Sequence, residues 1–337
     1  MRSFLLEYKK RDNSQSINAD IDLHVNLWSR NSHLLDNTPM PILDFGFMIN
    51  NIEDVSHIIL YCPFHIEKVD DLGKLLSSKP KLVEAIFNEN CEVSSMTYPN
   101  RVKIIKKGDD FRCSSGSENT FNIYQLDPEL ISIRDERIQI DVSGILSGNE
   151  CSISPLYENK RYYFRIRITP KDSISILKRE NEDINIFEDS SLRTTEIIDF
   201  RINDFRSITE NLREEALRLN IFSISSIHYL IMRNSTDEFV SGMSEYKSRL
   251  LEKEVWEEYI KLNKNDVIAY HFKNKLGEKI SSFSNLSRFK YPLNVMSRLC
   301  RYIIAIVILS ILSNMMYDFI MCILSQIIDL CRNKEGA

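Results

Sequence analysis

The chain has 337 residues and a formal net charge of −5 at pH 7, with 43% hydrophobic and 27% charged residues. These proportions are typical of a folded protein long enough for two domains, and the negative balance argues against binding nucleic acid through a general basic field. The seven cysteines are scattered without CxxC spacing, so we expect a reducing compartment rather than a disulfide framework.

The first 170 residues predict a β-rich domain with a sandwich or barrel-like form. Short runs with strand character recur between turns rich in Asn, Asp, Gly and Ser. The opening segment MRSFLLEYKKRD has too short an apolar run for a signal peptide. Segments 69–76 and 80–88 predict short helices or turns. The predicted strands are 3–8, 21–28, 42–49, 55–62, 101–106, 121–126, 131–133, 138–142 and 161–169.

Residues 190–275 predict a second domain of mixed α/β type, after an acidic and polar joint at 170–191. Residues 244–262 predict its longest helix, because apolar side chains such as Tyr246 and Trp256 recur at near-helical spacing. Residues 276–301 predict a basic linker. The whole chain therefore predicts an α+β fold. Its other predicted elements are a helix at 209–219 and strands at 197–202, 222–232 and 266–272.

The last apolar run, residues 302–330, is the strongest single signal. It carries no charge from Tyr302 to Tyr317, and Asp318 is the only charge before Asp329. A membrane-spanning helix needs about 20 predominantly apolar residues, so the run predicts a transmembrane helix. The positive-inside bias predicts a tail anchor in the inner membrane with the bulk of the chain in the cytoplasm. The basic residues ahead of it are Lys273, Lys275, Lys279, Arg288, Lys290, Arg298 and Arg301.

Polar residues of this run fall on one side of a helix at 100° per residue. A carboxylate near mid-bilayer costs about 2.5–3.5 kcal/mol, so such a group usually faces a partner helix or a water-filled path. The stripe therefore predicts self-association in the membrane. Two alternatives are a helix buried in the fold or in a partner interface, and two short helices broken near Asn314. The stripe residues are Ser310, Ser313, Asn314, Tyr317, Asp318, Ser325 and Asp329, and we assign the contact to Ser310, Asn314, Tyr317, Asp318 and Ser325.

Arginine supplies the main ligand signal. Arg161, Arg165 and Arg167 share one face of a predicted strand, and Arg201 lies at the end of the second predicted domain's first strand, 197–202. Guanidinium groups bind phosphate in bidentate fashion, so these four residues predict binding of an anionic ligand. The alternative is salt bridging to the 48 acidic residues of the chain.

Signals for catalysis are weaker. Asp20, Asp22 and His24 alternate onto one strand face and are weak candidates for binding Mg²⁺ or Mn²⁺, although an edge strand is often polar on one face. His228 lies in an apolar run, which is typical of a core histidine. No GxxxxGK[ST], GxGxxG or GxSxG motif is present. We therefore predict no catalytic residue, no cofactor and no nucleic-acid partner.

The layout is a soluble body followed by a hydrophobic tail, and it resembles bacterial membrane effectors of antiphage defence. The resemblance covers domain order and tail, and it transfers no site residues. It implies a membrane-anchored sensor and effector whose body binds a partner or an anionic ligand and whose helix clusters in the membrane. Two alternatives are a soluble scaffold protein whose C-terminal helix is a partner interface, and a metal-dependent nuclease or phosphodiesterase using Asp20, Asp22 and His24.

Overall fold

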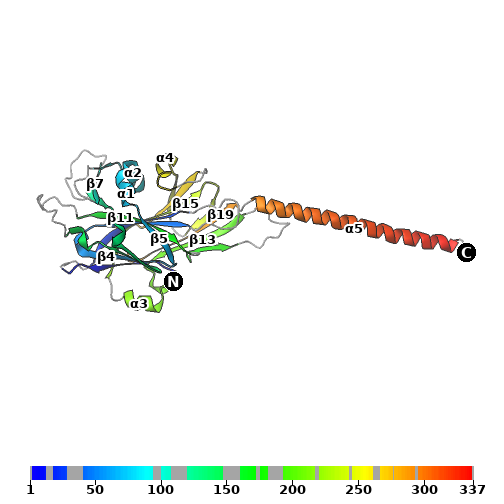
Figure 1. Cartoon of the computed structure of the whole chain (residues 1–337), viewed down its shortest axis with the longest axis horizontal. Coiled ribbons are helices and arrows are strands. Elements are labelled where there is room, and N and C mark those ends of the chain that lie inside the picture. Colours follow the sequence, from blue (N-terminus) through cyan, green and yellow to red (C-terminus); the bar gives the residue numbers. More distant parts are fainter. Residues whose placement is uncertain are drawn as a thin grey trace. The chain divides into compact units, whose positions relative to one another are not determined.

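The computed structural model describes most of the chain: residues 2–12, 18–28, 41–93, 100–107, 120–146, 160–171, 175–180, 193–216, 220–242, 245–260, 266–275, 277–292 and 295–335. These residues are mostly β-strand, in three sheets, with one long apolar helix at the C-terminus (Figure 1). Met1–Glu182 and Thr195–Tyr291 form one compact unit, here called the body. Asp183–Thr194 and Pro292–Ala337 form the second unit, which contains the long helix.

The largest sheet has ten strands and crosses the predicted domain division. β15 pairs in parallel with β2 and antiparallel with β18, so strands from both predicted domains are direct neighbours. Along the sheet the strands are β17 (Tyr246–Leu250), β18 (Val267–Lys273), β15 (Ser223–Asn234), β2 (Asp20–Trp28), β3 (Ile42–Ile49), β11 (Tyr162–Pro170), β8 (Thr120–Tyr124), β7 (Arg101–Lys106) and β6 (Cys91–Val93), with β5 (Ile66–Asp71) also paired to β11.

Two smaller sheets complete the β structure. The five-stranded sheet runs β14 (Asn220–Ile221), β1 (Leu5–Lys10), β4 (Val55–Tyr61), β10 (Arg137–Asp141) and β9 (Ile131–Arg134), with every pair antiparallel. The four-stranded sheet runs β12 (Leu177–Glu180), β13 (Arg193–Ile202), β19 (Phe283–Pro292) and β16 (Glu238–Gly242).

One hydrophobic core joins the three sheets. The apolar positions of β2 alternate inward as their period of two predicts, and Ile21, Leu23 and Val25 have no exposed surface. They pack in one cluster with Leu60 of the five-stranded sheet and Phe200 of the four-stranded sheet. The polar face of β2, with Asp22 and His24, therefore lies on the side of the ten-stranded sheet that faces away from this core.

Short helices cover that opposite side. α1 (Gly73–Ser78), α2 (Pro80–Phe87) and α4 (Lys253–Trp256) lie on one side of the ten-stranded sheet, and β4 lies on the other (Figure 1). Leu76, Val83 and Trp256 from these helices form a second buried cluster with the sheet. The other helices in the described part of the chain are η1 (Ile52–Asp54), η3 (Pro128–Leu130), η4 (Ser143–Leu146), η6 (Phe205–Ser207), α3 (Glu210–Ala216) and α5 (Val295–Glu335).

Residues 69–71, predicted as part of a short helix or turn, belong to β5, and two longer segments also differ from the sequence-based predictions. The helix predicted at 244–262 is instead β17, followed by the single turn of α4, because pairing with β18 outweighs a local helical pattern. The linker predicted at 276–301 contains β19, whose buried positions Asn285, Ser287 and Phe289 alternate with exposed ones. Two of these three inward residues are polar, so the sequence lacks the apolar alternation typical of a strand. Much of the predicted joint, namely 172–174 and 181–191, lies outside the described residues.

Candidate functional site

The C-terminal helix α5 is the most distinctive described feature. It runs unbroken from Val295 to Glu335, so the alternative of two short helices broken at Asn314 is wrong. Within it, Tyr302–Gln326 is 25 residues long with a mean hydropathy of 2.1 and has no buried portion. At about 1.5 Å per residue this span is roughly 37 Å long, more than the roughly 30 Å hydrocarbon core of a bilayer. The predicted single membrane-spanning helix is therefore present in length and composition.

Five polar residues follow one side of this span. Ser310, Asn314 and Asp318 are spaced four residues apart, and all five residues of the predicted contact lie within an arc of about 100°. The Ser325 hydroxyl donates a hydrogen bond to the Cys322 carbonyl oxygen (2.8 Å). The side chains of Asn314 and Asp318 have no hydrogen-bond partner in the described part of the chain. Their role in self-association stays a prediction.

The arginines of β11 surround a buried carboxylate. Asp44 on β3 has no exposed surface and accepts hydrogen bonds from the Arg167 guanidinium (2.7 and 3.1 Å), Trp28 Nε1 (2.6 Å) and the Tyr259 hydroxyl (2.7 Å). Arg165, also fully buried, donates to the same Tyr259 hydroxyl (2.6 Å). Burial raises the pKa of Tyr259, so the hydroxyl keeps the proton that it donates to Asp44. This cluster connects β2, β3 and β11 to the turn after α4.

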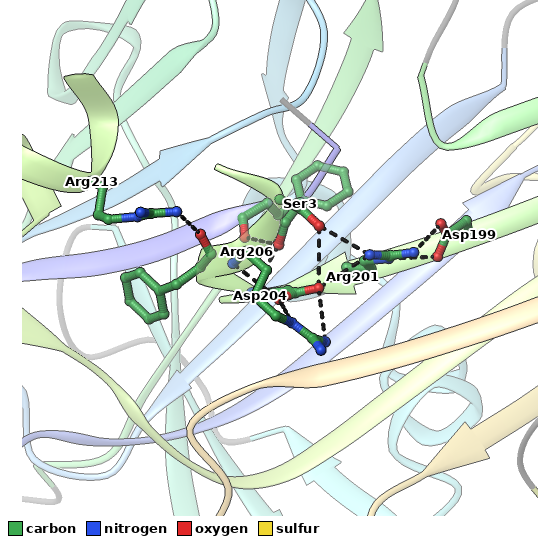
Figure 2. Close-up of polar contacts among 9 residues, drawn as sticks. Ser3, Asp199, Arg201, Asp204, Arg206 and Arg213 are labelled. Carbon is green, nitrogen blue, oxygen red and sulfur yellow. Dashed lines mark hydrogen bonds and ion pairs between the residues drawn. The ribbon is translucent and has the colours of Figure 1, made fainter. Parts of the chain in front are cut away.

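The other two predicted anion-binding arginines lie apart from this cluster. Arg161 precedes β11 and pairs with Asp22 (2.7 Å). Figure 2 shows Arg201, on β13, holding both oxygens of Asp199 (2.8 and 2.7 Å) and contacting Asp204 (3.2 Å). An anion reaching any of these groups competes with a carboxylate already in place. Anion binding by Arg161, Arg165, Arg167 and Arg201 stays a prediction.

Asp204 connects β13 to the N-terminal segment of the chain. Its backbone N–H donates to the Ser3 hydroxyl (3.0 Å), and its carboxylate accepts hydrogen bonds from Arg206 (3.0 Å), as Figure 2 shows. Hydrogen bonding to Arg206 is the main reason that the pKa of Asp204 is lowered to about 2. This arrangement is a structural junction, and the Arg201 network is part of it.

The three weak metal candidates have other partners. Asp20 pairs with Lys279 (2.7 Å), Asp22 pairs with Arg161, and His24 approaches the Tyr163 hydroxyl (3.3 Å). Within the described ranges, no group of three or more His, Cys, Asp or Glu side chains is placed to hold a metal ion. Glu196 on β13 is likewise engaged, because it is buried between Arg179 and Arg233.

A cavity of about 120 Å³ opens on the polar face of β2. The strands β2 and β15 form its floor, and the end of α2 forms one wall. An Asp22–Arg161 ion pair (2.7 Å) and a Glu89–Lys106 ion pair (2.8 Å) line it. Its lining residues include Asp22, His24, Phe87, Lys106, Arg161 and His228. These residues come from five separate segments of the chain.

Gly46 allows one polar contact beside this cavity. A Cβ at Gly46 would lie 2.1 Å from the Tyr163 hydroxyl oxygen, so only glycine lets the Tyr163 ring cross β3. The ring thereby reaches His24 on β2, with 3.3 Å between the Tyr163 oxygen and His24 Nδ1. Arg165 donates a hydrogen bond to the same Tyr163 oxygen (2.8 Å). His24 is thus held by a chain of buried polar groups.

Three histidines stand side by side on adjacent strands. His24 on β2 is opposite His228 on β15, with ring centroids 5.0 Å apart, and His228 Nδ1 lies 3.1 Å from Nε2 of His271 on β18. Burial is the main reason that the pKa of each of the three is lowered. For His271, burial and then the neighbouring His228 lower the pKa to about 4. All three imidazoles are therefore neutral at pH 7.

The histidine row predicts acid sensitivity. Between about pH 6.5 and 4, His271 is protonated in the unfolded chain but neutral in the folded chain. The free energy of unfolding therefore falls as the pH falls through this window. The full shift corresponds to about 3 kcal/mol, and solvent screening of the partly exposed ring reduces it to about 2 kcal/mol. We expect His271→Gln to flatten this slope in urea unfolding from pH 7 to 4, and the exposed His65→Gln to leave it unchanged. Equal slopes in the two variants would contradict this role.

Several residues of this region gave no usable sequence signal. Asp44 stands inside the apolar run ILDFGFMI, where nothing local identifies its partners. Lys106, Glu89 and Phe87 are ordinary surface or helix residues by pattern. Only the alternation of β2, which turns Asp22 and His24 to one side, pointed toward the cavity.

Comparison with known proteins finds no match to a protein-family model and no similar sequence among curated proteins.

Proposed function

We propose that the chain is a tail-anchored membrane protein whose body senses a ligand or partner in the cytoplasm and whose C-terminal helices associate in the membrane. The observation that carries the proposal is the unbroken apolar helix Tyr302–Gln326, which has no buried portion. Large apolar side chains are exposed along this helix, for example those of Ile306 (65% exposed) and Phe319 (67% exposed). Surface of this extent is unfavourable in water and favourable in lipid.

The charge distribution supports a cytoplasmic body. The residues shortly before the apolar span include Arg288, Lys290, Arg298 and Arg301, whereas Arg332 and Lys334 are the only basic residues after Gln326. Basic residues next to a membrane helix favour the cytoplasmic side and are attracted to its anionic lipids.

The polar stripe supports association between helices. Asn314 and Asp318 lack hydrogen-bond partners in the described chain, and a bilayer offers no water to supply them. A second copy of the same helix, turned to present the same stripe, provides partners of matching chemistry. Clustering of this kind would let a sensing body control the membrane, as in the bacterial antiviral defence effectors that the layout resembles.

One experiment tests anchoring and association together. The full chain is expressed in bacteria, the membranes are washed with carbonate, and the washed pellet is cross-linked. We expect the wild type in the pellet as cross-linked oligomers, and Asp318→Leu in the pellet as monomers because the stripe has lost its carboxylate. Ile308→Leu, on the opposite side of the helix, should behave as the wild type.

Two results would contradict different parts of the proposed function. A wild-type chain in the carbonate supernatant would exclude anchoring and favour a soluble scaffold protein, whose exposed apolar helix is covered by a partner. Equal cross-linking of Asp318→Leu and the wild type would exclude the stripe as the contact.

A further inference from the structure

We propose that the cavity between β2, β15 and the end of α2 binds an uncharged nitrogen heterocycle of the size of a nucleobase. The inference rests on the proposed function in treating the body as a ligand sensor, and it names the class of ligand. All lining residues belong to the body, so the site does not involve the C-terminal helix.

The size of the cavity sets the size of the ligand. One water-sized group occupies about 10–15 Å³ in this measure of volume, so the space of about 120 Å³ admits roughly eight to twelve non-hydrogen atoms. A pyrimidine or purine base falls in this range. A whole nucleotide exceeds it.

The hydrogen-bond chain beside the cavity determines which nitrogen of His24 carries the proton. The Tyr163 oxygen accepts a hydrogen bond from Arg165 (2.8 Å), so the hydroxyl proton of Tyr163 is free to be donated to His24 Nδ1 (3.3 Å). With Nδ1 as acceptor, the neutral His24 ring carries its proton on Nε2. This nitrogen has no hydrogen-bond partner in the described part of the chain, and its ring is 91% buried and lines the cavity. His24 therefore presents an unpaired donor at the cavity that a ligand can satisfy.

The charges around the cavity favour an uncharged ligand. Arg161 is neutralised by Asp22, and Lys106 by Glu89, so each cation at the cavity already has an acidic partner. Burial lowers the pKa of both His24 and His228, and both rings are neutral at pH 7. An anion would meet two carboxylates, and a cation would meet two basic groups. An uncharged molecule that carries hydrogen-bond donors and acceptors is repelled neither by the carboxylates nor by the basic groups.

The lining also combines hydrogen-bonding groups with apolar surface. The lining contains both donors (Lys106, Arg161 and His24 Nε2) and acceptors (Asp22 and Glu89). Apolar surface comes from Met48, Ile86 and Phe87. Flat heterocycles such as nucleobases combine a polar edge with apolar faces, and aromatic residues stack against them.

The test uses the full chain in mild detergent at pH 7.5. Adenine, guanine, cytosine and uracil are each added at 1 mM, with inorganic phosphate and ZnCl₂ at the same concentration for comparison. We expect at least one base to raise the thermal midpoint by about 3 °C or more and to give a saturable signal in titration calorimetry. We expect no such shift with phosphate or zinc.

Two variants locate the binding. His24→Leu removes the unpaired donor and should weaken the responding base about tenfold. Ser226→Leu fills the cavity from β15 without removing a buried polar contact, and should abolish binding even if His24→Leu fails to fold. His57→Leu, on the five-stranded sheet, is the matched control and should bind as the wild type does.

The proposal fails under any of three results. The first is that none of the four bases shifts the thermal midpoint. The second is that phosphate shifts it and the bases do not. The third is that a base binds equally well to the wild type and to Ser226→Leu. Because binding is measured in detergent, a failure here is independent of the carbonate-wash result on membrane anchoring.

Discussion

A chain that carries Leu312→Arg together with Met316→Arg is expected to move from the carbonate-resistant membrane fraction to the supernatant. Both residues lie near the middle of the apolar span and are exposed, at 51% and 64%. At 100° per residue both fall on the side of the helix opposite the polar stripe. The substitutions therefore place charge against lipid and leave the predicted contact between helices unchanged.

The magnitudes decide this result. Each arginine at the centre of a membrane helix costs about 2.5–3.5 kcal/mol on the insertion scale, so the pair costs about 5–7 kcal/mol. The span contains seven Ile, three Leu, one Val and one Phe, twelve residues in all. At about 0.3–0.6 kcal/mol each they contribute roughly 4–7 kcal/mol. The two arginines thus cancel the gain that the apolar side chains provide.

The matched control places the same two charges on the body. Val240 on β16 and Leu286 on β19 are exposed at 41% and 38%, and Val240→Arg with Leu286→Arg should leave the chain in the membrane pellet. Retention of the Leu312→Arg, Met316→Arg chain in the pellet would show that lipid does not hold this helix. The covering surface would then be a protein partner.

Replacing Asp44 by alanine is expected to reduce the free energy of unfolding of the body by about 3–5 kcal/mol. The change leaves Arg167 and the fully buried Arg165 without their carboxylate, and it removes the acceptor of Trp28 Nε1 and of the Tyr259 hydroxyl. Losing one partner of a buried ion pair leaves an uncompensated charge in the interior, which accounts for the size of the loss. Many domains are stable by only about 5–15 kcal/mol, so partial unfolding at 37 °C is within reach.

The measurement is urea unfolding of the full chain in mild detergent, followed by tryptophan fluorescence. The chain has two tryptophans, and both Trp28 and Trp256 are buried in the cluster beside Asp44, so their emission reports this region directly. Asp70→Ala is the matched control, because Asp70 forms an exposed pair with Lys68 (2.7 Å) that should contribute less than about 1 kcal/mol. Similar midpoints for the two variants would show that the Asp44 cluster does not stabilise the fold.

The local sequence pattern predicted the correct secondary structure in segments whose structure depends mainly on their own residues. The strand over 42–49 is present as β3, and the alternation of 161–169 is present in β11, with Phe164 and Ile166 in the core and Arg165 and Arg167 on the other face. The apolar run after Tyr302 is likewise helical along its whole length. In each case the period of the side chains or the length of the run is itself the physical cause.

Tertiary pairing decided the rest. Tyr246–Leu250 becomes a strand because β18 supplies its hydrogen bonds, and β19 forms although its inward residues Asn285 and Ser287 are polar. The same holds for the candidate site, where His24, Phe87, Lys106, Arg161 and His228 meet only after β2 pairs with β15 across two hundred residues. The sequence by itself determined a mostly β body and one helix suited to a membrane, because those properties are local. Which polar groups face one another, and the cavity between them, depended on long-range strand pairing that no spacing along the chain encodes.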